Sequence, residues 1–242
     1  MLNFPRIEIG SRMVYLRELK VGEALELARM PDSLLEARLT KFLAAILEDE
    51  SLALNLSVQE RYYLLMQYLS VQDGSPLTTN ANFNKYLLIP SQRETWRESI
   101  TEGALTVNHL TGAHVEMMET LCEDIADWIF GAMACQCDLS SNDWPKMPTG
   151  LAKTSDFSAV MRQRIAILES MDQTIFNDLY DQYAMLCDRL SRFVRTGFDS
   201  KGITILGGAD VDAPARFRAS ASLIGIIDRL GRCLAVNSWR II

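Results

Sequence analysis

The sequence has no excess of basic residues, and this absence weighs against a nucleic-acid partner. It contains 24 Lys and Arg against 31 Asp and Glu, which gives a formal net charge of −7. Proteins that bind nucleic acids neutralise phosphates with clusters of Lys and Arg, and their domains are typically basic. We therefore expect no nucleic acid among the partners of this chain.

Long apolar runs are also absent. The longest apolar stretch, residues 128–137, covers about half of the roughly 18 residues needed to span a bilayer. The first eleven residues include Pro5, Arg6 and Glu8 and have no apolar core of a signal peptide. These patterns predict a protein that does not enter a membrane and remains in the cytoplasm.

Cysteine is too sparse for a disulfide scaffold. The five cysteines are odd in number and scattered, whereas disulfide-rich secreted domains use dense and usually even sets. We interpret them as reduced thiols that act as small apolar side chains. They are Cys122, Cys135, Cys137, Cys187 and Cys233.

Sequence motifs for common chemistry are missing. We find no Gly-x-Ser-x-Gly, Gly-x-Gly-x-x-Gly or His-Glu-x-x-His pattern. Residues 197–202 have the glycine spacing of a P-loop, but Ile203 stands where a phosphate-binding lysine is required. Asp210 and Asp212 are interpreted as turn residues of a Gly-Pro loop. We accordingly predict no catalytic, cofactor-binding or metal-binding residue and no cofactor.

Histidine is scarce, and the two that occur, His109 and His114, are close in sequence. Cys135 and Cys137 follow them, but the pair has one intervening residue, fewer than the usual spacing of structural zinc ligands. We interpret all four as ordinary core or surface residues. The alternative is an enzyme or small-ligand-binding protein with a dispersed site around His109 and His114 and nearby acids.

The remaining pattern predicts a mainly α-helical protein. Hydrophobic residues make up 48% and charged residues 23% of the chain, as in globular proteins. Apolar residues at three- and four-residue steps predict six to seven helices, beside a small N-terminal β-hairpin and a few short strands. The helices are expected over 20–28, 33–47, 57–72, 112–134, 155–168, 172–195 and 219–235. The strands are expected over 7–9, 13–16, 86–89, 105–110 and 202–206.

Local signals fix some of these boundaries. Ser57 and Glu60 form a capping box, in which each side chain accepts a hydrogen bond from the backbone of the other residue. At the end of the helix over 172–195, Arg195 complements the helix dipole and Gly197 follows as the terminating glycine. Two regions are expected: an α+β region over 1–110 and a helical region over 111–242. A single continuous domain is the alternative.

Charge is distributed unevenly along the chain. Between Arg97 and Lys146 there is no Lys or Arg, and residues 98–143 are acidic, whereas the chain from Arg189 onward is rich in arginine. The two regions either pack together or are separately solvated. The other interpretation is that one of them faces an oppositely charged partner or another copy of the chain. The triplet 216–218, Arg-Phe-Arg, is interpreted as a core Phe between two outward Arg residues.

Two segments in the N-terminal third resemble a known family. Residues 13–30, MVYLRELKVGEALELARM, resemble the opening of bacteriophage tail-assembly proteins, in which a short strand leads into a helix. Residues 56–65, LSVQERYYLL, resemble a capped helix of the baseplate hub assembly proteins of contractile-tailed phages. Relatives in that family often carry a Cys pair after this helix, and residues 71–88 contain none. The resemblance identifies no functional residue.

The resemblance implies a non-enzymatic bacteriophage tail or baseplate protein, either a structural component or an assembly chaperone. Its partners would be other tail or baseplate proteins or a second copy of itself. It would be located in the cytoplasm of the bacterial host or built into the virion. A further alternative is a bacterial helical adaptor or regulatory domain.

Overall fold

The computed structural model describes residues 4–10, 12–72, 86–88, 97–148, 154–190 and 192–206. Within these ranges it is mainly α-helical, as expected, with small antiparallel sheets. The described helices are α1 (Val21–Arg29), α2 (Leu35–Leu47), α3 (Glu50–Asn55), α4 (Val58–Gln72), α5 (Gly112–Leu121), α6 (Ile125–Gln136), α7 (Thr154–Glu169) and α8 (Gln173–Arg189).

The strands form three separate sheets in this part of the chain. They are β1 (Ile7–Ile9), β2 (Arg12–Val14), β3 (Ser99–Glu102), β4 (Leu105–Asn108), β5 (Cys137–Leu139), β6 (Arg195–Asp199) and β7 (Gly202–Leu206). β1 pairs with β2, β3–β4–β5 form a three-stranded sheet, and β6 pairs with β7, all antiparallel. The N-terminal hairpin and the strand over 202–206 are therefore confirmed.

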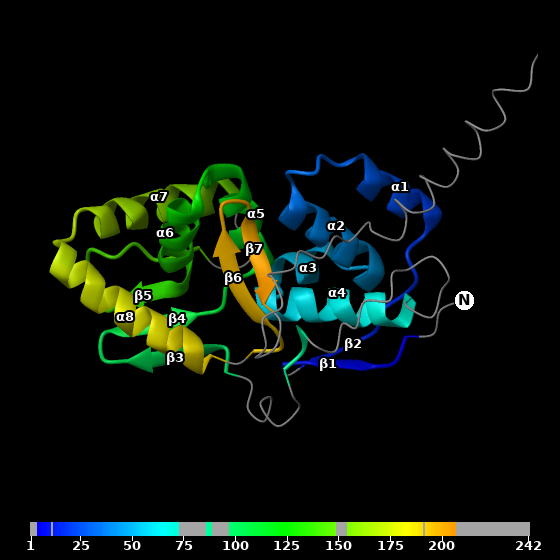
Figure 1. The fold of residues 1–242 in the computed structure, drawn as a ribbon, viewed down its shortest axis with the longest axis horizontal. Helices are drawn as coiled ribbons and strands as arrows, with labels where there is room; N and C mark the ends of the chain where they lie inside the picture. The colour runs from blue at the N-terminus through cyan, green and yellow to red at the C-terminus, as the bar shows by residue number, and fades with distance from the viewer. Residues whose placement is uncertain are drawn as a thin grey trace, which may run out of the picture.

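Figure 1 shows how these elements are arranged. The helices α1 to α4 lie on one side with β1 and β2, and the β3–β4–β5 sheet lies on the other with α6, α7 and α8. The hairpin of β6 and β7 stands between the two groups (Figure 1). Helix α5 contacts α2, α3 and α4 as well as α6 and α7. It therefore contacts helices that precede residue 110 in the sequence and helices that follow it.

Two clusters of buried apolar side chains form the core. The larger one contains residues of β1 and β2, of the helices from α1 to α7 and of the β6–β7 hairpin, and it includes Phe42, Leu65, Val115 and Ile205. The smaller one lies between the three-stranded sheet and helices α6 to α8, with Val107, Leu168 and Leu186 among its members. Most of helix α4 is buried, including the polar residues Gln59, Glu60 and Arg61 in its first turn.

Several predicted boundaries are wrong. The single helix expected over 112–134 is two helices, because Cys122 is extended and Asp124 starts α6 by accepting from the backbone N–H of Asp127. The helix expected to reach Arg195 ends at Arg189, since Leu190 adopts an extended backbone conformation. Arg195 and Gly197 consequently lie in β6 and do not terminate a helix.

Helix α3 was not expected at all. Glu48 ends α2 in the left-handed region, with φ of 57°, and the side chain of Asp49 then accepts from the backbone N–H of Leu52 to start α3. The chain therefore passes from one helix to the next without any Gly or Pro between them. Strands β3 and β5 were likewise unexpected. The helix expected over 219–235 lies outside the described residues.

Candidate functional site

The two histidines line one pocket, with a volume of about 620 Å³. We call it the histidine pocket. It is formed by the end of β4, the start of α5, the last turn of α6, β5 and the segment that follows β5. Its lining residues are Asn108, His109, Thr111, His114, Cys135, Asp138, Leu139, Ser140, Ser141, Asn142, Trp144, Lys146, Met147 and Pro148.

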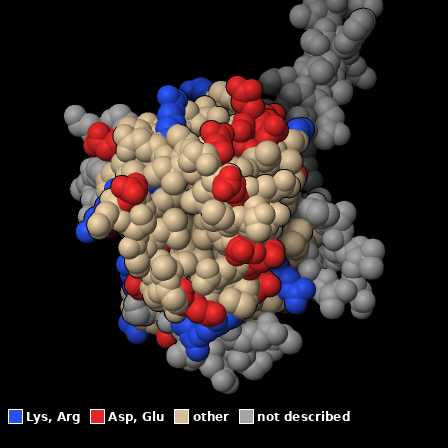
Figure 2. Space-filling view, turned by 90° about the vertical axis from the view of Figure 1, so that its left-hand side faces the viewer, with Lys and Arg blue, Asp and Glu red and all other residues tan. Residues whose placement is uncertain are grey.

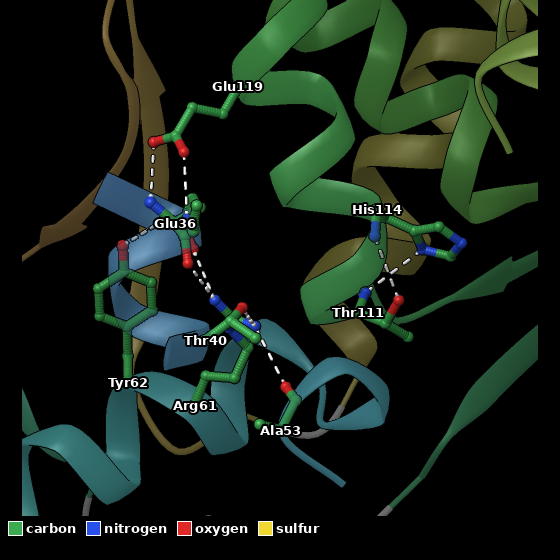
Figure 3. A network of polar contacts seen from close by, with 9 residues as sticks. Glu36, Thr40, Ala53, Arg61, Tyr62, Thr111, His114 and Glu119 are labelled. Carbon is green, nitrogen blue, oxygen red and sulfur yellow. Dashed lines mark hydrogen bonds and ion pairs between the residues drawn. The ribbon is translucent and has the colours of Figure 1, made fainter. Parts of the chain in front are cut away.

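His114 is held by the start of helix α5. The Thr111 backbone N–H donates to Nδ1 of His114 at 3.3 Å, and the His114 backbone N–H donates to Oγ1 of Thr111 at 3.4 Å (Figure 3). This is a capping box with His in the position usually taken by Glu or Gln. Because Nδ1 accepts a hydrogen bond, the proton of the neutral ring is on Nε2.

The charge state of His114 follows from its surroundings. Its side chain is buried against Phe157 in an edge-on contact. Burial, followed by the nearby positive charge of Arg164, lowers the pKa of His114 to about 4. The ring is therefore neutral at physiological pH and presents a hydrogen-bond donor at Nε2.

His109 has a different environment. Its Nε2 donates to the backbone carbonyl oxygen of Arg97 at 3.0 Å. Burial lowers its pKa below the ordinary value of 6.5. The structure thus brings both predicted histidines to one pocket, although they make separate hydrogen bonds.

The cysteines nearest to the pocket are not arranged for nucleophilic or metal chemistry. Cys135 belongs to the last turn of α6 and to the larger core cluster, whereas Cys137 begins β5 and belongs to the smaller one. Burial raises the pKa of Cys135 to about 12, so its thiol is protonated. Among the described residues, no group of three or more His, Cys, Asp and Glu side chains could hold a metal ion.

Arg164, on α7, binds several of the segments that border the histidine pocket. Its guanidinium donates to the carbonyl oxygens of Ala134, Cys137 and Pro145 at 2.8, 2.8 and 2.7 Å. It also forms an ion pair with Asp138 at 2.6 Å. The guanidinium lies over the ring of Trp144, 4.9 Å from its centroid. This residue ties α6, β5 and the segment after β5 to α7.

A second buried arginine, Arg61 on α4, holds the N-terminal helices together (Figure 3). It donates to Oγ1 of Thr40 at 2.8 Å, to the carbonyl oxygen of Ala53 at 3.2 Å and to that of Glu36 at 2.9 Å. An ion pair of 3.3 Å joins it to the Glu36 carboxylate, which also accepts from the Tyr62 hydroxyl at 2.6 Å. Such buried networks fix the relative positions of helices.

Glu119 extends this network from α5 to the start of α2. Its two carboxylate oxygens accept from the backbone N–H groups of Glu36 and Ala37 at 2.8 and 3.1 Å (Figure 3). The carboxylate thereby satisfies donors that a helix start leaves free, and it complements the helix dipole. Burial nevertheless raises the pKa of Glu119.

Neither arginine was identified as a site residue from the sequence. Each occupies a position on the apolar face of its helix: Arg164 is three residues after Met161 and four before Leu168, and all three are buried. The sequence signal that could have identified these two residues is an arginine within a helical stripe of apolar residues. The capping box of Ser57 and Glu60 is confirmed, with distances of 2.8 and 3.3 Å.

Among the described residues, an ion pair between Arg189 and Glu102 joins the basic region to the acidic stretch over 98–143. Glu116 and Glu119 are partly buried, and the other acids of this stretch are exposed. Figure 2 views the end of the molecule at which α7 turns into α8: most of this face is uncharged, acidic atoms are scattered over it with the largest group towards the upper right, and basic atoms lie towards its edges. In residues 121–148 and 154–182, positive charge is limited to Lys146, Arg162 and the buried Arg164.

An apolar groove opens among these acids, with a volume of about 240 Å³. We call it the acidic groove. It is lined by Leu121, Cys122, Ala126, Asp127, Phe130, Met161, Arg162, Ile165 and Glu169. Ile125, which precedes the lining residue Ala126 on α6, is exposed, and Phe130 stacks on Phe176 of α8 with ring centroids 5.0 Å apart.

Other predicted features are placed as follows. Cys122, Cys135, Cys137 and Cys187 are free thiols. Cys233, Asp210, Asp212 and the triplet 216–218 lie outside the described residues. Within the ranges that the structure describes, none of the helices is long and apolar enough to cross a membrane.

Comparison with known proteins gives no assignment. No protein-family model matches the chain, and neither a curated protein nor a solved structure matches it.

Proposed function

We propose that this protein acts by binding other proteins and performs no catalysis, and that its binding surface includes the acidic groove. The observation that carries the proposal is the combination, at one end of the molecule, of an apolar groove with a rim that bears two exposed carboxylates, Asp127 and Glu169, and one arginine, Arg162. Such a surface fits a partner segment that places apolar side chains in the groove and Lys or Arg on the rim.

The geometry of the groove supports this use. Its floor is apolar, with Phe130 and Ile165 contributed by α6 and α7, while Asp127 and Glu169 stand exposed at its edge. Ile125, which precedes Ala126 on α6, leaves 48% of its surface exposed. The Asp127 carboxylate also accepts from the backbone N–H of Glu123 at 2.8 Å, so its position is fixed before any partner arrives. A rigid site of this kind reduces the entropy lost on binding.

The partners that we propose are tail or baseplate proteins of a bacteriophage, with the chain serving as a structural component or an assembly chaperone. The support is the resemblance of residues 13–30 and 56–65 to tail and hub assembly proteins. The second of these segments forms the start of α4, whose Arg61 and Tyr62 hold the N-terminal helices together. It would therefore act as scaffold and leave binding to the surface.

The experiment is an affinity pull-down of the tagged protein from cells that express its native operon, read by mass spectrometry. The wild type is expected to recover tail-tube, tape-measure or baseplate proteins in a fixed ratio. Glu169→Lys should lose most of this recovery, because it reverses a charge on the rim of the groove. The helix should tolerate the change, since Lys is favourable in a last turn.

The matched control is Glu8→Lys, an identical charge reversal at an exposed position of β1, on the opposite side of the molecule. It should recover the same partners as the wild type. Recovery of the protein alone, or with metabolic enzymes, would refute the phage assignment. Equal loss in both variants would refute the role of the acidic groove.

A further inference from the structure

We propose that the histidine pocket is a binding site for a small organic carboxylate with an apolar body. This inference does not rest on the proposed function, because the histidine pocket and the acidic groove are lined by different residues.

The first observation is the unused donor of His114. The side chain is 91% buried, with a relative exposure of 9%. Nδ1 accepts from Thr111, and Nε2 lies on the opposite side of the ring (Figure 3). Within the described residues we find no hydrogen-bond partner for Nε2. Because His114 lines the histidine pocket, its Nε2 is a donor that a ligand in the pocket can engage without displacing a protein partner.

The second observation is the charge balance of the lining. Asp138 is compensated by Arg164, to which its Oδ1 is paired at 2.6 Å, and its Oδ2 accepts from Nδ2 of Asn108 at 3.0 Å. Lys146 is exposed at the pocket and makes no ion pair within the part of the chain described. The lining therefore has one uncompensated positive charge, which matches a monoanion.

The third observation concerns the rest of the wall. Leu139, Trp144 and Met147 give the pocket an apolar side, opposite in character to the Nε2 donor and the ammonium of Lys146. The volume of about 620 Å³ lies within the range of sites for small organic ligands. The carboxylate group of the ligand would be bound by His114 and Lys146, while its apolar body would contact Leu139, Trp144 and Met147.

These features select against other anions. A phosphate is best bound by several arginine or backbone N–H donors, because it carries up to two charges and has no apolar surface. Here Arg164 is committed to three carbonyl oxygens and to Asp138. A molecule with one carboxylate and an apolar body uses both sides of the pocket.

The test uses 3-phenylpropionate as the probe and follows the ring signals of the two histidines by NMR on histidine-labelled full-length protein. With only two histidines, the variant His114→Gln assigns both signals. 3-Phenylpropionate is expected to shift the His114 signals in a saturable way and to raise the pKa of this ring above about 4, because a bound anion stabilises the charged form. The uncharged 3-phenylpropionamide should bind at least about tenfold more weakly, a difference of about 1.4 kcal/mol.

Variants separate the contributions. Lys146→Gln changes an exposed residue, so it should fold, and it is expected to weaken binding roughly three- to fivefold. Arg29→Gln removes an exposed positive charge from α1, away from the pocket, and should leave binding unchanged. His114→Gln retains an acceptor for the backbone N–H of Thr111 and should weaken binding about tenfold.

Three outcomes would overturn the proposal. The first is no saturable shift of the His114 signals at millimolar probe. The second is equal binding of the acid and the amide, which would make the pocket an apolar cavity without anion selectivity. The third is an equal response to inorganic phosphate, which would show that charge alone is recognised.

Discussion

Replacing Gly112 by alanine should destabilise the protein, although alanine is the better helix former. Gly112 is the first residue of α5, and a Cβ atom built on it would lie 1.9 Å from Nη1 of Arg61 and 2.8 Å from the carbonyl oxygen of Ala53. The guanidinium would have to leave its place between Thr40, Ala53 and Glu36. Because Arg61 is fully buried, no solvent is available to replace these partners.

The magnitude follows from two opposing effects. The helix propensity of alanine contributes at most about 1 kcal/mol in its favour. Disrupting a buried ion pair by displacing one partner costs about 3–5 kcal/mol. We therefore expect Gly112→Ala to lower the free energy of unfolding by about 2–4 kcal/mol. Urea unfolding followed by circular dichroism measures this difference directly.

A matched control is available in α1. A Cβ atom on Gly22 would meet nothing within 4 Å, so Gly22→Ala should leave stability unchanged or raise it by up to about 1 kcal/mol. In an Arg61→Met background the penalty of Gly112→Ala should become smaller, because the nearest obstacle is gone. The reasoning is refuted if Gly112→Ala unfolds at the same urea concentration as the wild type or at a higher one.

Three further outcomes are expected. Arg164→Lys should lower the free energy of unfolding by about 3 kcal/mol in urea, because one ammonium cannot replace all the donors of the guanidinium; unchanged stability would contradict this. The hydrogen bond and charge of Arg17 lower the pKa of Glu23 to about 2, so its stabilising contribution is complete above 4.5 and is lost as pH falls towards 2. The difference in thermal stability between wild type and Glu23→Gln should therefore shrink across that window, and a constant difference would disprove it. Burial raises the pKa values of Cys135 and Cys137, so iodoacetamide should modify both thiols only after unfolding, as peptide mapping would show; rapid labelling of the native protein would rule this out.

The sequence was informative where apolar periodicity and capping chemistry acted together. The segment from Ser57 shows this best, since a capping box precedes a run of buried residues and α4 begins at Val58. Periodicity alone did not reveal where one helix gives way to another. Cys122 fits the apolar stripe of 112–134, and only the capping by Asp124 marks the break between α5 and α6.

The histidine pocket could be predicted only in part. His109 and His114 attracted attention because they are the only histidines of the chain. Their pocket also needs Asp138 and Lys146, which β5 and the segment after it bring into place. The strand β5 is three residues long and follows a helix directly, so it is too short for an alternating pattern to predict it. Pairing with β4, a tertiary contact, decides its conformation.

The position of Arg61 beneath α5 also bears on how the chain folds while it is being synthesised. Its partners Glu36, Thr40 and Ala53 leave the ribosome before α5 does, and Gly112 and Glu119 emerge later. Until then, the charged guanidinium remains hydrated, and the four N-terminal helices lack the element that covers it. The N-terminal helices α1 to α4 therefore cannot complete their packing until α5 has been translated. A nascent chain halted at residue 110 would present an open, apolar-rich intermediate to chaperones and proteases.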